Sequence, residues 1–178
     1  MMARMVSRDA VLSIMKDSRV GAYGAIGVAM MLGLKWSILV SHPRATLPAI
    51  VMGAHVVSRW WAIGLIWRLP YVRTEADGKS KALAGNLGGA QWLLSGALGA
   101  LALLPVCLLV DPAAGPGLAL ALLAALALSA ASILVAGAYF STRIGGYTGD
   151  CLGAAQQLAE LAFLLAALGV LIAIQPPG

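Results

Sequence analysis

Charged residues are scarce in this sequence. Asp, Glu, Lys and Arg make up 11% of its 178 residues, whereas soluble domains carry about 25%. Hydrophobic residues account for 61%, and the mean hydropathy is +0.90. A chain this poor in charge cannot cover a water-facing surface, so a soluble globular domain is excluded. The composition predicts an integral membrane protein in contact with lipid.

Cysteine and histidine are scarce as well. The two cysteines, Cys107 and Cys151, lie far apart and have no CxxC or Cys/His spacing. A zinc site and a disulfide framework are therefore unsupported, and His42 and His55 are too few for a histidine-rich metal site. The net charge is +5, but the basic residues form no stripe with interleaved aromatic residues. No nucleic-acid partner is therefore expected.

What the sequence does contain is long apolar runs. They are continuous rather than alternating, which favours helices over barrel strands, and each is long enough to cross a bilayer. The runs are roughly Gly24–Val40, Leu47–Trp67, Ala90–Val110, Gly117–Phe140 and Leu158–Ile174. The expected fold is all-α, a polytopic membrane helical bundle with about five transmembrane helices in a single domain over residues 1–178.

The first 22 residues differ from the rest because they mix charged and apolar positions. Val11, Leu12, Ile14 and Met15 recur at helical spacing, which predicts a short amphipathic helix at the membrane surface. Acidic residues interrupt the segment and no small-residue cleavage site follows it, so it does not fit a secretory signal.

The basic residues indicate an orientation. If residues 1–22, 68–89 and 141–151 face the same side, that side holds nine of the twelve basic residues, and the other side holds Arg44. Lys and Arg are enriched in cytoplasmic loops. The three polar segments are therefore predicted to be cytoplasmic and the C-terminus to be external.

A few polar residues interrupt the apolar runs. His55 and Arg59 are four apart and share a helical face; Arg59 is either functional or snorkels toward the cytoplasmic end. Lys35, near the outer end of its run, is expected to snorkel. Glu160 supports a cytoplasmic site from below, pairs with Arg59, or is structural.

The stretch Arg143–Glu160, RIGGYTGDCLGAAQQLAE, holds the densest polar motif. Gly145, Gly146 and Gly149 permit a tight turn and a close approach of backbone N–H groups to a ligand. Asp150 stands where a helix is expected to begin. It either caps that helix or holds a metal ion that faces a phosphate.

Arginines and a few carboxylates dominate the predicted cytoplasmic face, without a Ser-His or Cys-His pair. This combination suits a phosphate-bearing substrate, because carboxylates hold Mg²⁺ and arginines neutralise the charge on the transferred group. The residues concerned are Asp17, Arg19, Arg59, Arg73, Lys79, Lys81, Arg143, Asp150 and Glu160.

Four motifs give the chain a specific resemblance to a known family. IMKDSRVGAYG (14–24), HVVSRW (55–60), LPYVR (69–73) and GGYTGDCLGAAQQLAELAFLL (145–165), in this order and spacing, closely resemble the cobalamin synthases, also called adenosylcobinamide-GDP ribazoletransferases. The resemblance implies a Mg²⁺-dependent, multi-pass enzyme of the bacterial inner membrane. The implied reaction joins adenosylcobinamide-GDP to α-ribazole, or to its 5′-phosphate, and releases GMP.

The matched motifs also imply site residues. Asp17, Arg19 and Asp150 are the implied catalytic residues, and Asp150 and Glu160 are the implied Mg²⁺ ligands. The implied substrate-binding residues are Ser18, Arg59, Arg73, Arg143, Gly145, Gly146, Thr148 and Gly149.

The chain departs from the family pattern in two places. Family members carry a further N-terminal portion ending in an acidic motif of the type Asp-Gly-Leu-Ala-Asp-x-x-Asp-Gly, and this motif is absent here. The chain is therefore expected to be an incomplete version, from a late start codon or a truncated gene, that lacks the principal Mg²⁺ ligands. Gln157 stands where some members carry an acidic residue.

Two other functions stay open. One is a different membrane phosphotransferase, such as an enzyme acting on CDP-alcohols, although the Asp-Gly-x-x-Ala-Arg pattern of those enzymes is absent. The other is a small permease or a structural membrane subunit, which would be indifferent to the loss of Arg19 or Asp150.

Overall fold

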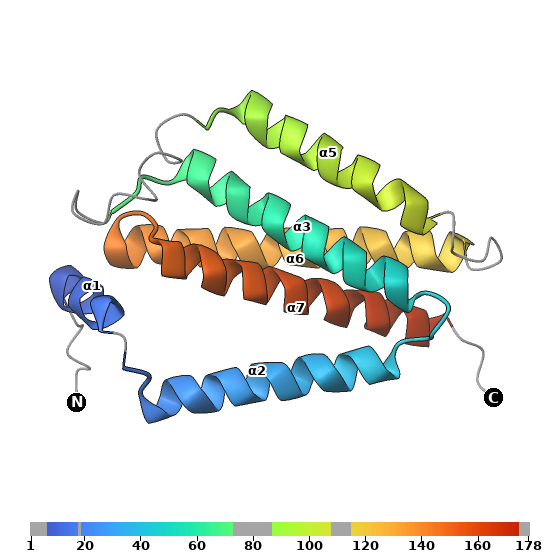
Figure 1. Ribbon diagram of the computed structural model, residues 1–178, viewed down its shortest axis with the longest axis horizontal. Helices are drawn as coiled ribbons and strands as arrows, with labels where there is room; N and C mark the ends of the chain where they lie inside the picture. The colour runs from blue at the N-terminus through green and yellow to red at the C-terminus, as the bar shows by residue number, and fades with distance from the viewer. Residues whose placement is uncertain (1–6, 18, 73–86, 108–114, 175–178) are drawn as a thin grey trace.

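The computed structural model describes residues 7–17, 19–72, 87–107 and 115–174 (Figure 1). This part contains the helices α1 (Arg8–Lys16), α2 (Ala22–Ser41), α3 (Leu47–Arg68), α5 (Gly89–Cys107), α6 (Gly115–Ile144) and α7 (Gly149–Ala173). The described residues form no strand, although Tyr71 and Tyr147 make an isolated bridge. The all-α prediction is confirmed.

Four of these helices, α2, α3, α6 and α7, are long and apolar enough to cross a membrane. The third predicted span, Ala90–Val110, corresponds to α5, whose apolar part, Gly89–Pro105, is shorter than the others. Since a span needs about 20 residues, α5 is at the short end of the range. The helical membrane bundle is confirmed.

The last two helices extend beyond the predicted apolar runs. The fourth run was expected to end at Phe140, and α6 continues to Ile144. The fifth run was expected to begin at Leu158, and α7 begins at Gly149, one residue before Asp150, where a helix was expected to begin. The predicted polar loop 141–151 is therefore mostly helix, and the link between the two helices is a turn over residues 145–148.

Small residues bring the central helices together. The contact between α6 and α7 is the most extensive, α3 packs on both of them, and α5 packs on α3. Ala121 and Ala125 of α6 and Ala155 and Ala159 of α7 are fully buried. Small side chains of this kind let helix backbones approach closely within a membrane. By contrast, α2 is largely exposed, with Ile38 as its buried residue.

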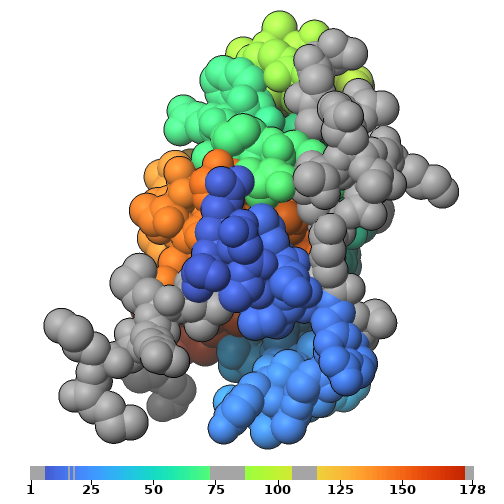
Figure 2. Space-filling view, turned by 90° about the vertical axis from the view of Figure 1, so that its left-hand side faces the viewer, coloured from blue at the N-terminus to red at the C-terminus, as the bar shows by residue number. Residues whose placement is uncertain are grey.

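Three described segments meet at one end of the bundle, here called the polar end: α1, residues 69–72 and the turn 145–148 (Figure 1, left). Figure 2 looks onto this end and shows α1 lying over the joined ends of α6 and α7. Val11 and Leu12 of α1 pack against the buried Ile144 and Tyr147. The structure thus confirms the predicted amphipathic helix and brings described parts of the three polar segments to a common end.

Candidate functional site

The turn between α6 and α7 is built on two glycines with different constraints. Gly145 has φ +78°, a left-handed conformation that glycine adopts at no steric cost. Gly146 is buried, and a side chain there would collide with the Pro70 carbonyl. Backbone conformation and packing therefore explain why glycine stands at both positions, whether or not they also bind substrate.

A short backbone bridge locks this turn to the chain that follows α3. The Tyr147 N–H donates to the Pro70 carbonyl at 2.9 Å, and the Val72 N–H donates to the Tyr147 carbonyl at 3.1 Å. The rings of Tyr71 and Tyr147 meet edge to face with centroids 5.5 Å apart. Burial, followed by the charge of Tyr71, raises the pKa of Tyr147. Its phenol therefore stays neutral at physiological pH.

Thr148, not Asp150, caps α7. The Thr148 Oγ1 accepts a hydrogen bond from the Cys151 N–H at 3.3 Å, and Thr148 is fully buried. The cap interpretation of Asp150 was therefore wrong. Asp150 is exposed in the first turn of α7, where the helix dipole favours a negative charge.

Asp17 and Arg19 form an exposed ion pair at the junction of α1 and α2. Arg19 donates from Nε to both oxygens of Asp17 at 3.0 Å and from Nη2 to Oδ2 at 2.7 Å. The Arg19 side chain, and next its backbone N–H, lower the pKa of Asp17. Both residues lie at the polar end, and both carboxylate oxygens of Asp17 accept hydrogen bonds from Arg19.

Further guanidinium groups lie at the same end. Arg143 lies over the ring of Tyr139 at 5.8 Å. The Arg8 guanidinium approaches Gly145, with Cζ 3.7 Å from where a Cβ would stand. Arg8 was counted in the charge bias but missed as a site residue, because its approach to Gly145 depends on the docking of α1. Ser18 and Arg73 lie outside the described residues.

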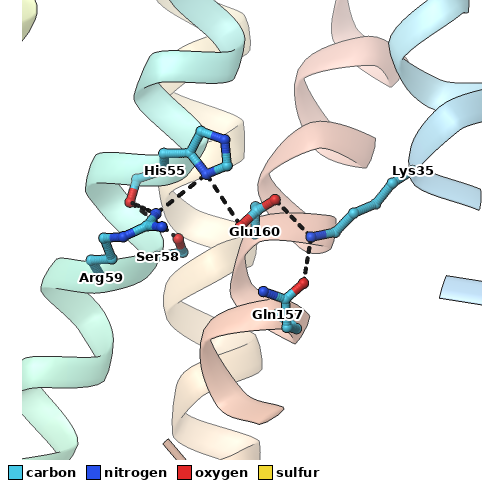
Figure 3. A network of polar contacts seen from close by, with 6 residues as sticks. All are labelled: Lys35, His55, Ser58, Arg59, Gln157 and Glu160. Atoms are coloured by element: carbon cyan, nitrogen blue, oxygen red, sulfur yellow. Dashed lines mark hydrogen bonds and ion pairs between the residues drawn. The ribbon is translucent and has the colours of Figure 1, made fainter. Parts of the chain in front are cut away.

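A second polar cluster, here called the intramembrane network, lies between α2, α3 and α7 (Figure 3). The Lys35 Nζ donates to Glu160 Oε1 and to Gln157 Oε1, both at 2.6 Å. The side chains of Lys35 and Glu160 are 13% and 8% exposed. The expectation that Lys35 snorkels was wrong, because its ammonium is held between the helices by α7.

The α3 part of the intramembrane network consists of His55, Ser58 and Arg59. The Arg59 Nη1 donates to the His55 carbonyl at 3.0 Å and lies 3.2 Å from His55 Nδ1. His55 Nδ1 lies 3.4 Å from Glu160 Oε2. Glu160 therefore pairs with Lys35 and reaches Arg59 through His55, so the predicted direct pair between Glu160 and Arg59 is not present.

The two proposed Mg²⁺ ligands are far apart. Asp150 and Glu160 are ten residues apart on α7, a rise of about 15 Å, so they cannot bind the same ion. The described residues contain no group of three His, Cys, Asp or Glu side chains placed to hold a metal. The described part therefore does not fit a Mg²⁺ site by itself, although each carboxylate remains a predicted ligand.

An apolar cavity of about 430 Å³ lies between α3, α5 and α6. Trp61, Trp67 and Trp92 line it, together with Arg68 and Ser141 from the last turns of α3 and α6. Because those turns are at the polar end, the cavity lies beside it. The volume falls within the range of small-molecule sites.

His42, at the opposite end, was not considered as a site residue. It is buried, and its Nε2 lies 3.3 Å from the Leu164 carbonyl. Burial lowers its pKa, so the ring is neutral. His42 thus ties the end of α2 to α7.

Comparisons with known proteins identify the family. The family model described as cobalamin-5-phosphate synthase matches residues 1–168. The chain is 41% identical over 157 residues to the adenosylcobinamide-GDP ribazoletransferase of Ralstonia nicotianae, which covers 86% of this chain and 55% of the relative. Proteins of the same name are 36% identical over 174 residues in Polaromonas sp. (89% and 59% covered) and 40% over 171 residues in Shewanella pealeana (91% and 60%).

The chain thus spans about 55–60% of the length of these curated relatives. No solved structure matches it. The family model accounts for nearly the whole chain, and the chain belongs to the cobalamin-5-phosphate synthase family.

Proposed function

We propose that this chain carries a membrane-embedded part of an adenosylcobinamide-GDP ribazoletransferase. In the proposed reaction, a hydroxyl of α-ribazole, or of its 5′-phosphate, attacks the phosphate that is attached to cobinamide. A new P–O bond forms, the bond to the second phosphate breaks, and GMP leaves. The product is adenosylcobalamin or its phosphate.

The observation that carries this proposal is the gathering of three polar segments at one end of an apolar bundle in a member of this family. Arg8, Arg19 and Arg143 place guanidinium groups there. Guanidinium groups form strong, charge-assisted hydrogen bonds to phosphate oxygens and balance charge that develops during phosphoryl transfer. Catalysis of this kind needs positioning and electrostatics rather than a covalent nucleophile.

The Mg²⁺ requirement is a part of the proposal to which the described residues contribute little. When bound, Mg²⁺ would neutralise charge on the phosphate oxygens. Asp150, exposed in the first turn of α7 at the polar end, is the carboxylate that we assign to this role. The remaining ligands must come from outside the described residues, and the acidic family motif that the sequence lacks is the proposed source.

We also propose that the polar end faces the cytoplasm across a bacterial inner membrane. Nine of the twelve basic residues belong to the three polar segments, and Lys and Arg are enriched on the cytoplasmic side. Water-soluble substrates would then reach the bundle from the compartment that makes nucleotides.

A direct assay tests the function. Membranes that contain this chain, and membranes that contain a version extended at the N-terminus with the acidic family motif, receive adenosylcobinamide-GDP and α-ribazole, and GMP and cobalamin are measured. We expect product from the extended version and a large loss with Asp150→Asn. Arg44→Gln, an exposed change at the opposite end, should leave the rate unchanged. Product from neither version would reject the proposal.

The intramembrane network favours one alternative, a small permease, because transporters bind substrates near the middle of the membrane. Proteoliposomes separate the two functions. A permease would carry a substrate across the bilayer without releasing GMP, and Asp150→Asn would not change the flux.

A further inference from the structure

We propose that Arg59 and His55, supported by the Lys35–Glu160 pair, form a binding site for a phosphate group inside the membrane. The site is separate from the polar end. It rests on the proposed function, because the choice of a phosphate group as ligand comes from the substrates proposed there. Three features point to the site: the direction of the Arg59 side chain, the net charge of the intramembrane network and the unused hydrogen-bond donors of Arg59.

The direction of Arg59 excludes snorkelling. α3 runs from Leu47 at the opposite end to Arg68 at the polar end. Arg59 bonds to His55, one turn back toward Leu47, so its guanidinium lies deeper in the bundle than its own Cα. His55 is 13 residues from Arg68, a distance of about 20 Å along the helix. A side chain seeking the polar end would point the other way.

The charges of the intramembrane network do not balance. Lys35 and Arg59 are cations, and Glu160 provides the one negative charge among the described groups of the network. The sequence has seven acidic residues, and Glu160 alone stands within a predicted apolar run. Two cations against one carboxylate leave the network with an excess of positive charge. An unbalanced charge at membrane depth is costly and marks a functional site.

Arg59 also has hydrogen-bond donors to spare. Its Nη1 is used by His55, but its Nε and Nη2 groups have no partner among the residues that the structure describes. Arg59 is exposed, and the side chain of His55 is 46% exposed. A planar guanidinium fork matches two phosphate oxygens.

His55 adds a second polar group to the site. Its Nδ1 lies 3.2 Å from Arg59 Nη1 and 3.4 Å from Glu160 Oε2, which places the imidazole ring beside the guanidinium. Lys35 holds Glu160 at 2.6 Å, which keeps that carboxylate from neutralising Arg59 directly. Lys35 and Glu160 are thus positioning residues, and Arg59 and His55 are the residues expected to contact the anion.

The test uses the full chain in lipid nanodiscs and inorganic pyrophosphate as the probe, with binding measured by calorimetry. We expect Arg59→Gln to weaken binding at the intramembrane site about tenfold or more, since a charge-assisted hydrogen bond is lost. Arg59→Lys keeps the positive charge without the planar fork, so its affinity for pyrophosphate should lie between those of wild type and Arg59→Gln. Arg44→Gln is the matched control at the opposite end, and Arg19→Gln reports pyrophosphate bound at the polar end.

Two results would overturn the site. One is pyrophosphate binding that is the same in wild type and Arg59→Gln while circular dichroism shows both to be folded. The other is Arg59-dependent binding of acetate but not of pyrophosphate, which would indicate a carboxylate from another membrane segment as the natural partner. The binding assay needs no ribazole and no turnover. Arg59-dependent binding together with no GMP release from either the chain or its extended version would therefore reject the proposed function and keep the site.

Discussion

Removing the ammonium of Lys35 is the sharpest test of how this bundle is held together. α2 buries little of its surface, and Lys35 joins it to α7 through two hydrogen bonds of 2.6 Å. Lys35→Met keeps the length and apolar stem of the side chain but leaves the carboxylate of Glu160 without its cation. We expect a clear loss of stability, because Glu160 is 8% exposed and cannot be rescued by water.

The expected magnitude lies between two known limits. Polar contacts between transmembrane helices contribute about 0.6 kcal/mol on average and up to about 1.7. Breaking a buried ion pair by removing one partner costs about 3–5 kcal/mol in water-soluble proteins. Lys35→Met should therefore lower the free energy of unfolding by about 2–3 kcal/mol, and Glu160→Gln by a similar amount. The double variant should lose about 2 kcal/mol less than the sum, because the second change removes the orphaned charge.

Reversible unfolding in mixed micelles, followed by circular dichroism, measures these values. Leu34→Met, an exposed neighbour on α2, is the matched control and should stay within about 0.5 kcal/mol of wild type. The charge swap Lys35→Glu with Glu160→Lys should recover part of the loss. The reasoning would be refuted if each single variant lowered the free energy of unfolding by less than about 0.5 kcal/mol and the two losses were additive. Such a result would show that the pair does not hold α2.

Three further predictions concern the polar end. Gly146→Ala should lower the free energy of unfolding by about 1–3 kcal/mol because its methyl group meets a backbone carbonyl, whereas Gly149→Ala, with open space around it, should be nearly neutral in the same melt. Thr148→Val should cost about 1 kcal/mol by removing the cap of α7, and Thr148→Ser should recover it. NMR titration should place the pKa of Asp17 below its ordinary value of 3.8. The pair with Arg19 is then intact above that value and lost as the pH falls through the lowered pKa, and Arg19→Gln should reduce the shift, leaving the smaller part that the backbone N–H of residue 19 causes.

Hydropathy predicted the bounds of α3 more closely than those of α6 and α7. α3 was expected at Leu47–Trp67 and spans Leu47–Arg68. For α7 the apolar run was expected from Leu158, nine residues after the helix begins, because Asp150 and Gln157 lower the apolarity of its first half. The cap signal of Thr148 before Gly149 is present in the sequence and would have located the true start.

The polar end was easier to predict than the intramembrane network. The distribution of Lys and Arg among the polar segments predicted which of them share an end, because each segment is covalently connected to the helices on either side of it. The partner of Lys35 is 125 positions away on α7, and its choice depends on how α2 is rotated and how deep its side chain lies. Neither quantity follows from the spacing of residues in one helix, so an inward lysine and a snorkelling lysine look the same in the sequence.

Helix α2 connects the two polar regions. Its first residues follow the Asp17–Arg19 pair, and it meets the bundle near Lys35 and Ile38. Thirteen residues, or about 20 Å, separate Ala22 from Lys35, and nearly all of them are exposed. The position of Arg19 relative to the turn before α7 is therefore fixed at two points: α1 packed on that turn, and Lys35 bound to Glu160. We therefore expect a change at Lys35 to shift the polar end through α2, without touching any residue there.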